Sequence, residues 1–429
     1  MVTVSEGAGT SLLGGISSAF RINPYTGQHL TVRRAHGPYL ETADGSVLID
    51  MFMAHGSTVL GHAHPAVFDA LRSRLESGVV IGYETGLGET VASRISEIVP
   101  SAEQVRFVAS GSEAVATAMR LARAHTGRDI IIKIDGHFNG GSDYAMLNSL
   151  VRDIDAANAG GHPSQPIFSS GGIPRAVAET VIPVPWNDLP ALEATFTRYR
   201  DQVAGVIMVP IDFNNGCIEP ARGYLAAAQD LAHAHEALLI FDEVLSGFKT
   251  GLSGAQGLYD VTPDVTTLSK ALSSGVPLSA IVGRREFMET LAKPVPQGAI
   301  QGGTFAGNIL GLAAAEATLQ VLSEPEFYPT LLGRSERFFR QLQAMLDASP
   351  TAARVQWVGC MFTVYVGTRE PVRTYRDIRR LDPSLARAFF RRVIDRGVYF
   401  HTDFSVSAAH TEEALNEVLT RLEDAATAT

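Results

Sequence analysis

The sequence predicts an α/β protein with a mostly parallel sheet, followed by a smaller α+β domain at the C-terminal end. Several segments are continuous apolar runs, as expected for strands that are covered on both faces. Helical stretches separate several of these runs, which favours a parallel sheet with helices on both sides. After residue 310 the pattern changes to long helices and a few short strands. A chain of 429 residues is long enough to bury a sizeable core.

Helices and strands are expected to alternate from about residue 88. The helix ETVASRISEIV precedes the strand QVRFVAS, and the helix SEAVATAMRLARAHTG, which Gly127 ends, precedes the strand DIIIKI. Further strands are expected in ETVIPV, VAGVIMVPI and ALLIFDEV, with GYLAAAQDLAHAHE as a helix before the last one. The segment 147–178 is rich in Gly, Pro, Ser and Asn, and a loop of this length is usually functional or mobile.

The two ends of the chain have weaker patterns. The first 35 residues or so are expected to be irregular, and PYLETADGSVLIDMF then predicts a hairpin that turns at Asp44-Gly45. HPAVFDALRSRLESG predicts a helix that closes at Gly78. Near the C-terminus, two long helices are expected before a strand in VQWVGCMFTVYV, and the helix PSLARAFFRRVIDRG, a short strand and a final amphipathic helix follow.

Composition and charge exclude several classes of protein. The net charge of -10, without a basic patch, argues against nucleic-acid binding, which needs clustered Lys and Arg. No apolar run reaches about 18 residues, so we expect no membrane span. The first residues do not resemble a signal peptide. Cys217 and Cys360 form neither a disulfide framework nor a metal cluster, and we interpret them as small buried residues. A cytoplasmic protein fits these observations.

Only four lysines are present, so a mechanism that needs a lysine has four candidates: Lys133, Lys249, Lys270 and Lys293. Lys270 lies in PDVTTLSKALSSGVPLSAIVG, where a β-rich run meets a turn of Gly and Ser. A lysine that forms a Schiff base must be held rigidly and needs a lowered pKa. The end of a buried strand meets both conditions, although a purely structural lysine remains the alternative.

Two further positions combine polar groups with a strand end. Asp242 ends the apolar run ALLIFD, and a carboxylate there is costly to bury without a partner. It is either a cap or salt-bridge residue, or a partner for a pyridinium nitrogen. Ser110, Gly111 and Ser112 lie between a strand and a helix, where free N–H groups form an anion site. Serines that only cap a helix are the alternative.

Taken in order along the chain, these stretches resemble the class III aminotransferases, and among them most closely the glutamate-1-semialdehyde aminomutase group. The resemblance runs from about Gly14 to the C-terminal helix. The stretches that carry it are GHAHPAV, VRFVASGSEA, RLARAHTGRDIIIK, LLIFDEV, PDVTTLSKALSSGVPLSAIVGR, GTFAGN and SAAHTEE. Each stretch is weak alone, but coincidence is improbable when all occur in this order.

The resemblance implies pyridoxal 5′-phosphate (PLP) as cofactor and PLP fold type I, which is the aspartate aminotransferase-like fold. It implies an N-terminal segment, 1–60, that contributes to the small domain and the active site. It also implies a large PLP-binding domain, 61–309, and a small C-terminal α+β domain, 310–429. The partners would be a small-molecule amino donor and a carbonyl acceptor, together with a second copy of the chain in a homodimer.

The resemblance also implies a role for each residue that matches the family pattern. Lys270 would form the internal aldimine and move the proton between the substrate carbon and the cofactor, while Asp242 would pair with the ring nitrogen. The remaining residues would contact the phosphate, the ring faces and the phenolic oxygen of the cofactor. They are Ser110, Gly111 and Ser112 at the phosphate, Phe138 and Val244 on the two ring faces, Asn214 near the phenolic oxygen, and Thr304 at the phosphate of the neighbouring subunit.

The sequence departs from the family pattern where substrate is expected to bind. The loop Gly136–Gly140 has Asn139 where the family usually has His, and Val209-Pro210 stands where Glu-Pro is usual. His55 replaces a tryptophan that is common in the aminomutases. The loop before SAAHTEE is about four residues shorter and lacks the glutamate that the aminomutases carry there. The changes leave Lys270 and Asp242 intact, so we expect PLP chemistry on a different substrate from glutamate 1-semialdehyde.

Four residues are therefore candidates for substrate contacts. Arg21 aligns with an arginine that holds a substrate carboxylate in the aminomutases, and bidentate pairing would suit an acidic substrate. It could equally be a surface or interface arginine. His55 and His401 could line the same pocket or be structural histidines, and Asn139 lies beside them in the same pocket lining. The segment 147–178 matches the position of a mobile active-site cover in the relatives and could gate the site.

An aminotransferase is the first functional hypothesis. An intramolecular aminomutase needs the same cofactor residues, and only an external amino donor separates the two. Decarboxylation or epimerisation on the same fold is a third alternative. A non-catalytic relative is the fourth, although the loss of Lys270 or Asp242 would be its expected signature, and both residues are present.

Overall fold

A seven-stranded sheet forms the centre of the computed structural model, which describes residues 11–149 and 166–427. All neighbouring strands run parallel except β10, which is antiparallel to both of its neighbours. Their order across the sheet is β4 (Gln104–Val108), β10 (Ser279–Gly283), β9 (Val265–Leu268), β8 (Leu238–Glu243), β7 (Val203–Met208), β5 (Ile130–Ile134) and β6 (Val181–Val184). The α/β class and the mostly parallel sheet are therefore confirmed.

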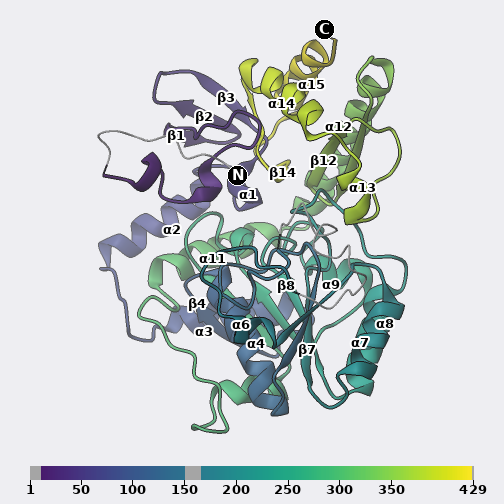
Figure 1. Ribbon diagram of the computed structural model, residues 1–429. Helices are drawn as coiled ribbons and strands as arrows, with labels where there is room; N and C mark the ends of the chain where they lie inside the picture. The colour runs from purple at the N-terminus through teal and green to yellow at the C-terminus, as the bar shows by residue number, and fades with distance from the viewer. Residues whose placement is uncertain (1–10, 150–165, 428–429) are drawn as a thin grey trace.

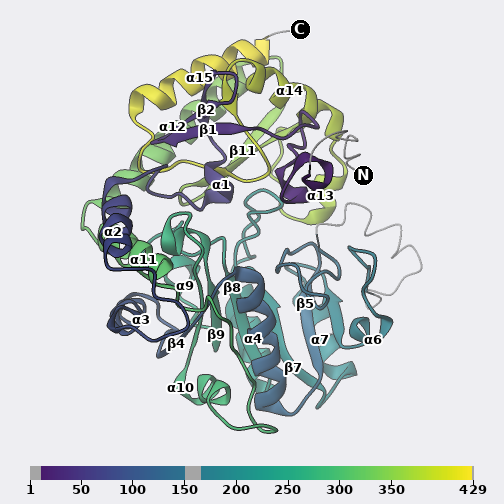
Figure 2. The ribbon, with the colours of Figure 1, turned by 90° about the vertical axis from the view of Figure 1, so that its left-hand side faces the viewer.

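Helices cover both faces of this sheet, which explains why its strands are apolar at successive positions. In β5, Ile130, Ile132 and Ile134 pack into one core cluster, and Ile131 packs into another on the opposite face. The first cluster includes α7 (Leu189–Arg198) and α8 (Tyr224–Ala234). The second is built on α4 (Gly111–Thr126), which crosses the face of the sheet that is turned to the viewer in Figure 2.

The N-terminal strands join the C-terminal part of the chain. β1 (Val32–His36), β2 (Tyr39–Thr42) and β3 (Val47–Asp50) form an antiparallel sheet that β13 (Val398–Tyr399) extends in parallel along β3. Figure 1 shows these purple strands beside the yellow C-terminal helices, above the central sheet. Segments from the two ends of the sequence therefore meet above the same edge of the large domain.

The C-terminal region adds a second small sheet and its helices. β11 (Ala353–Val358), β12 (Met361–Val366) and β14 (Phe404–Ser405) pair antiparallel. Helices on this side include α12 (Phe327–Ala348), α14 (Pro383–Asp395) and α15 (Glu412–Thr427). Their apolar faces share one core cluster with α2 (Pro65–Glu76), α3 (Gly86–Ile98) and α11 (Ile309–Leu322).

Most sequence-based helices and strands are confirmed to within a few residues, and two expectations are wrong. The predicted single strand VQWVGCMFTVYV is a hairpin of β11 and β12, because the chain reverses at Gly359 with a φ of 62°. A Cβ there would lie 2.2 Å from the Lys249 carbonyl oxygen, so only glycine fits the turn. The first 35 residues are not wholly irregular, since β1 begins at Val32.

Other expectations concern cysteines, membranes and the long loop. Cys217 and Cys360 are buried and free, as predicted. No described helix is long and apolar enough to cross a membrane. Part of the predicted gate, 150–165, lies outside the described residues. The described part of that segment includes the short helix α6 (Arg175–Ala178).

Candidate active site

Most of the residues predicted to hold the cofactor come together at one end of the central sheet. Asp242 lies at the end of β8, and its neighbour Val244 faces Gly111 at the start of α4, where an added Cβ would lie 3.0 Å from the valine methyl groups. The charges of Asp242 and Lys270 influence each other. In sheets of this kind, ligands bind beyond the carboxyl ends of the strands, which is where these residues meet.

Asp242 is buried and surrounded by donors. Its Oδ2 accepts a hydrogen bond of 2.8 Å from the Asn139 side-chain amide. Its Oδ1 accepts hydrogen bonds of 3.1 Å from the Val244 backbone N–H and the Thr267 hydroxyl. Burial raises the pKa of Asp242, whereas these donors and the Lys270 charge lower it in part. The Asp242 carboxylate therefore has hydrogen-bond donors around it, but a positive group next to it would stabilise its negative charge further.

Lys270 follows β9 and begins the short 3-10 helix η3 (Lys270–Ser273). Its φ of 46° places a non-glycine residue in the left-handed region, which is characteristic of residues that the surrounding structure constrains. Burial lowers its pKa, although the charges of Asp403 and then Asp242 raise it in part. A lysine with this environment spends more time as a free amine, which is the form that attacks a carbonyl carbon.

The start of α4 has the free donors that the predicted anion site requires. Ser110 caps the helix: its Oγ accepts a hydrogen bond from the Glu113 N–H, and the Glu113 carboxylate accepts one from the Ser110 N–H. Within the described residues, the backbone N–H groups of Gly111 and Ser112 have no acceptor. The Ser110 and Ser112 hydroxyls accept backbone hydrogen bonds and can still donate their own protons.

The loop after β5 lies against this helix start. Gly140 approaches so closely that a Cβ would lie 2.8 Å from the Ser112 Oγ, and the Gly141 N–H donates to that oxygen. Phe138 packs edge-to-face on Phe20 with ring centroids 5.6 Å apart, so the N-terminal segment reaches the site. The Asn139 Oδ1 is buried without a partner among the described residues, while its amide is committed to Asp242.

The structure adds Asp403, which the sequence analysis did not single out. It is fully buried, with its Oδ2 2.7 Å from His55 Nδ1, and its Oδ1 accepts a 3.3 Å hydrogen bond from the Asn214 side chain. Burial opposes its ionisation, but the hydrogen bond and charge of His55, then the Lys270 charge, hold the pKa of Asp403 below its ordinary value. An isolated Asp inside the apolar segment VYFHTDFSV was the available sequence signal.

Thr267 and Glu113 were also missed, and both had weaker signals. Thr267 lies on the buried strand β9, three residues before Lys270, and a buried hydroxyl needs a hydrogen-bond partner. Glu113 completes a Ser-x-x-Glu pattern with Ser110, which is the signature of a capping box. Neither signal shows which strand or loop lies opposite, so neither identifies the Asp242 neighbourhood alone.

The predicted substrate residues from the two chain ends lie together. Phe52 packs against both His55 and His401, at centroid distances of 4.3 Å and 4.6 Å. Burial, then the nearby His55 charge, lowers the pKa of His401 to about 4, so this ring is neutral at pH 7. Arg21 is exposed at the end of η2 (Ala19–Arg21), and its charge acts on His401 and Tyr399.

Thr304 lies in an exposed turn before α11, beside Phe305, whose side chain is also exposed. No described contact joins Thr304 to the other candidate residues of the same chain. Its predicted role at a neighbouring subunit requires a second copy of the chain and stays a prediction.

The other lysines differ in burial. Lys133 and Lys249 are fully buried, and burial lowers the pKa of each to about 8. Lys133 Nζ donates a 2.5 Å hydrogen bond to the His137 carbonyl, and Lys249 Nζ donates to the Gly56 carbonyl. Lys293 is exposed. Lys270 is partly buried and makes no side-chain hydrogen bond to a described residue, unlike Lys133 and Lys249, which leaves its amine available for chemistry.

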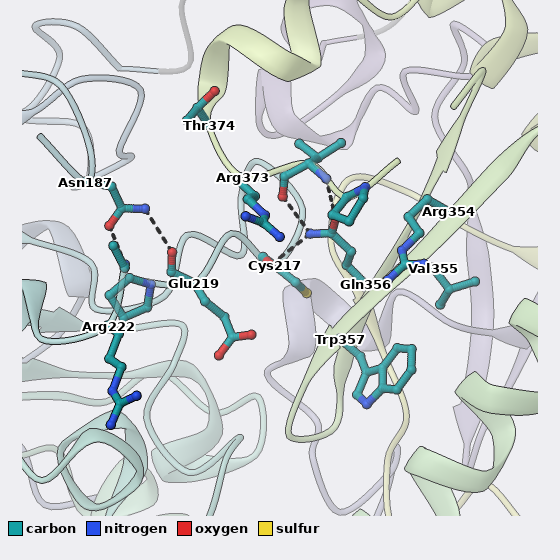
Figure 3. Close-up of a pocket in the computed structure, with 14 residues that line it drawn as sticks. Asn187, Cys217, Glu219, Arg222, Arg354, Val355, Gln356, Trp357, Arg373 and Thr374 are labelled. Carbon is teal, nitrogen blue, oxygen red and sulfur yellow. Dashed lines mark hydrogen bonds between the residues drawn. The ribbon is translucent and has the colours of Figure 1, made fainter. Parts of the chain in front are cut away.

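An open groove of about 680 Å³ lies elsewhere, between the large and small parts of the molecule (Figure 3). Asn187 and Arg222 line one side, and Arg354 and Trp357 of β11 line the other. None of the predicted cofactor residues lines this groove. The chemistry of the cluster around Lys270 therefore identifies the candidate active site better than cavity size does. No group of described residues has the make-up of a metal site.

The residues present fit the PLP that the sequence resemblance implies. The free N–H groups at the start of the 16-residue helix α4 suit a phosphate. The buried Asp242 suits a protonated ring nitrogen, and the partnerless Asn139 Oδ1 leaves an acceptor beside it. Lys270 is near enough to Asp242 for their charges to interact, as one cofactor touching both would require.

Comparisons with known proteins agree with this site. A model of the family described as aminotransferase class-III matches residues 22–425. An omega-transaminase from Sphaerobacter thermophilus is 26% identical and superposes with a TM-score of 0.86, covering 97% of this chain and 94% of that one. For a beta-phenylalanine aminotransferase from Variovorax paradoxus, identity is 25%, the TM-score 0.84 and the coverage 96% and 90%.

A glutamate-1-semialdehyde aminomutase from Pseudomonas aeruginosa PAO1 has the same fold, with a TM-score of 0.83 at 23% identity, covering 94% of this chain and 89% of that one. Both the transaminases and the aminomutase are thus similar to this chain over nearly its full length. With a family model that spans almost all of the sequence, the chain belongs to the class III aminotransferases, which are PLP-dependent enzymes.

Proposed function

We propose that Lys270 holds the cofactor and that the enzyme moves an amino group from a small amine donor to a small ketone or aldehyde. The carrying observation is the environment of Lys270, which combines a left-handed backbone, a lowered pKa and an amine that has no hydrogen-bond partner among the described residues. The neighbouring carboxylate of Asp242 would keep the cofactor nitrogen protonated. These features suit a lysine that alternates between holding a cofactor and moving a proton.

When bound, PLP supplies an electron sink that stabilises negative charge at the substrate carbon. The protein has to bind, orient and handle protons. Asp242 would hold a proton at the ring nitrogen, and Lys270 Nζ would carry a proton to and from the substrate carbon. Val244 and Phe138 would limit the tilt of the ring from its two faces. Asn214 would lie near the phenolic oxygen.

The start of α4 would bind the phosphate through the N–H groups of Gly111 and Ser112, with the hydroxyls of Ser110 and Ser112 as added donors. Thr304 would reach the phosphate of the neighbouring subunit in a homodimer. Near Thr304 in the sequence, the side chains of Ile300 and Phe305 are exposed, and a second copy of the chain would cover them. Size measurement of the holoenzyme tests the dimer.

We also propose the domain division 1–60, 61–309 and 310–429. The pairing of β3 with β13 supports placing the N-terminal segment with the small domain. Helices α2, α11 and α12 share a single core cluster. The proposed domains therefore follow the path of the chain and do not each have a separate hydrophobic core.

Aminomutase activity is the second candidate, on the resemblance of the cofactor residues to that group. The His55–Asp403 pair favours an altered substrate, because the resemblance implies a tryptophan and a glutamate in this region in the aminomutases. A requirement for an external donor supports the transferase. Amino movement within one molecule, without such a donor, supports the mutase.

The test is a half-reaction with the PLP-loaded enzyme. Each of a panel of amines is added alone, and conversion of the cofactor to its aminated form is followed by absorbance. Lys270→Ala should lower the rate by at least about 10³-fold, because it removes the nucleophile and the proton carrier together. Lys293→Ala, at the exposed lysine, is the matched control and should behave as the native protein does.

Full activity in Lys270→Ala would overturn the assignment of this lysine. Absence of conversion with every donor would overturn the transferase, and product analysis for release of carbon dioxide or inversion would then separate the remaining PLP reactions.

A further inference from the structure

His55 is held in an unusual backbone conformation. It belongs to the turn α1 (Met53–Gly56), in which Met53, Ala54 and His55 have φ values of 48°, 54° and 56°. Non-glycine residues rarely adopt the left-handed region, and three in succession persist only where the surroundings impose them. The surrounding structure therefore constrains this turn, and the turn fixes the direction of the His55 side chain.

The surroundings that impose this turn are buried. Lys249 Nζ donates a hydrogen bond to the Gly56 carbonyl, which anchors the end of the turn. A Cβ at Gly56 would lie 3.1 Å from both the Lys249 Cε and the Met361 sulfur, so these two side chains pack closely against the turn. A buried lysine that serves a backbone carbonyl gives the turn a polar anchor in the core.

Asp403 then orients the imidazole ring. The 2.7 Å contact between its Oδ2 and His55 Nδ1 places an acceptor at that nitrogen, so Nδ1 carries the proton. Asp403 itself is held ionised by His55 and by the charge of Lys270, and Asn214 donates to its other oxygen. In neutral His55 the lone pair consequently lies on Nε2, which makes no hydrogen bond to a described residue.

The pair is next to the reacting lysine. Of the charges that act on Lys270, that of Asp403 is the larger influence and that of Asp242 the smaller. The turn α1, which carries His55, packs against η3, which begins with Lys270. The His55 side chain is 26% exposed, whereas that of Asp403 is fully buried. The ring can therefore meet a ligand while its carboxylate cannot.

We propose that Asp403 is a positioning residue that presents His55 Nε2 as a hydrogen-bond acceptor for a hydroxyl group beside the reacting carbon of the substrate. The substrates would be amino alcohols and the matching hydroxy ketones or aldehydes. The inference rests on the proposed aminotransferase function. A buried carboxylate disfavours a substrate carboxylate in the same place, so an acid group would have to lie toward Arg21.

The test compares two amines of the same shape with the PLP-loaded enzyme and pyruvate as a common acceptor. 2-Amino-1-propanol has a hydroxyl where 2-aminobutane has a methyl group. The native enzyme should favour the amino alcohol in kcat/KM by at least about 10-fold, because a site built to bind a hydroxyl discriminates against analogues that lack it. His55→Phe should abolish this preference, and the loss should appear in KM for the amino alcohol.

Asp403→Asn supplies a second readout that activity alone does not give. Nitrogen NMR of histidine-labelled protein should show the His55 proton on Nδ1 in the native protein and a mixture of tautomers in Asp403→Asn. The amino-alcohol preference should fall in the same variant. His29→Phe, at an exposed histidine of the N-terminal segment, is the matched control and should change neither the preference nor the His55 signals.

The outcomes separate this inference from the proposed function. Conversion of no amine by the native enzyme would refute the aminotransferase and this inference with it. Equal use of the two amines by an active native enzyme, or a preference that survives His55→Phe, would refute only the hydroxyl site. If Asp403→Asn does not fold, the kinetic comparison of His55→Phe with His29→Phe still decides the question.

Discussion

The two halves of the candidate site are built in different ways. The cofactor half, which contains Asp242 and the start of α4, is carried by the regular ends of sheet strands and by a capped helix. The substrate half, which contains His55, His401 and Asp403, comes from the two ends of the chain and includes a left-handed turn. In the proposed site, the cofactor would therefore be held by the regular elements of the large domain, and the substrate would be selected by side chains from the two chain ends.

The halves also differ in how they handle charge. On the cofactor side, burial raises the pKa of Asp242, and neutral donors hold its carboxylate. On the substrate side, a hydrogen bond to His55 and nearby positive charge lower the pKa of Asp403. Both carboxylates act on Lys270, so the two halves meet electrostatically at that one amine.

The largest effect that would test this division of roles is expected at Asp242. Asp242→Asn keeps the size of the side chain and removes its charge, so kcat/KM for amino transfer should fall by roughly 10²–10³-fold, the range for losing one electrostatic partner of a reacting group. The steady-state rate of the PLP-loaded enzyme measures this. Thr267→Val, which removes only one hydrogen bond to Asp242, should have a much smaller effect. Equal losses in the two variants would contradict a charge-based role.

An intermediate effect is expected from the pH dependence of stability on the substrate side. The pKa of His401 is lowered to about 4 in the fold, below the ordinary value, so the unfolded chain takes up its proton first as the pH falls. The contribution of His401 to the free energy of unfolding is therefore present above pH 6.5 and falls as the pH drops toward 4. Between pH 7 and pH 5 this one residue should lower the free energy of unfolding by about 2 kcal/mol. His401→Gln should remove that loss.

The measurement is urea unfolding of both proteins at pH 7 and pH 5, taken as the difference between native and variant. This difference is needed because Asp212, whose pKa burial raises to about 7, changes stability in the opposite direction. A loss of the same size in His401→Gln would place the pH sensitivity elsewhere.

The smallest effect is expected at the helix cap of the cofactor half. Ser110→Ala removes the hydroxyl that accepts from the Glu113 N–H, and should lower the free energy of unfolding by about 1 kcal/mol. Thermal unfolding without cofactor measures this contribution, and the affinity for PLP measures the added phosphate role. Unchanged stability together with weakened PLP affinity would show that Ser110 serves the ligand only.

The fold was largely predictable, and the candidate residues of the cofactor half could be singled out, because their signals are local. Apolar runs on both faces of β5, β7 and β8 predict a covered parallel sheet, and Ser110–Ser112 and Asp242 stand directly at strand ends. The hairpin of β11 and β12 was missed because a single glycine within an apolar run has the composition of a continuous strand. Its turn is set by contact with Lys249, about a hundred residues earlier in the chain.

The sequence by itself therefore determined the α/β class, and it singled out Lys270, Asp242 and the start of α4 as candidates for holding the cofactor. Only the tertiary structure decided that His55 and Asp403, which are 348 residues apart in the chain, form one hydrogen-bonded pair. It also decided that Lys249 anchors the turn that carries His55. The physical reason is that a strand end or a helix cap is determined by residues that are neighbours in the sequence. The His55–Asp403 pair instead depends on packing that brings the two ends of the chain together.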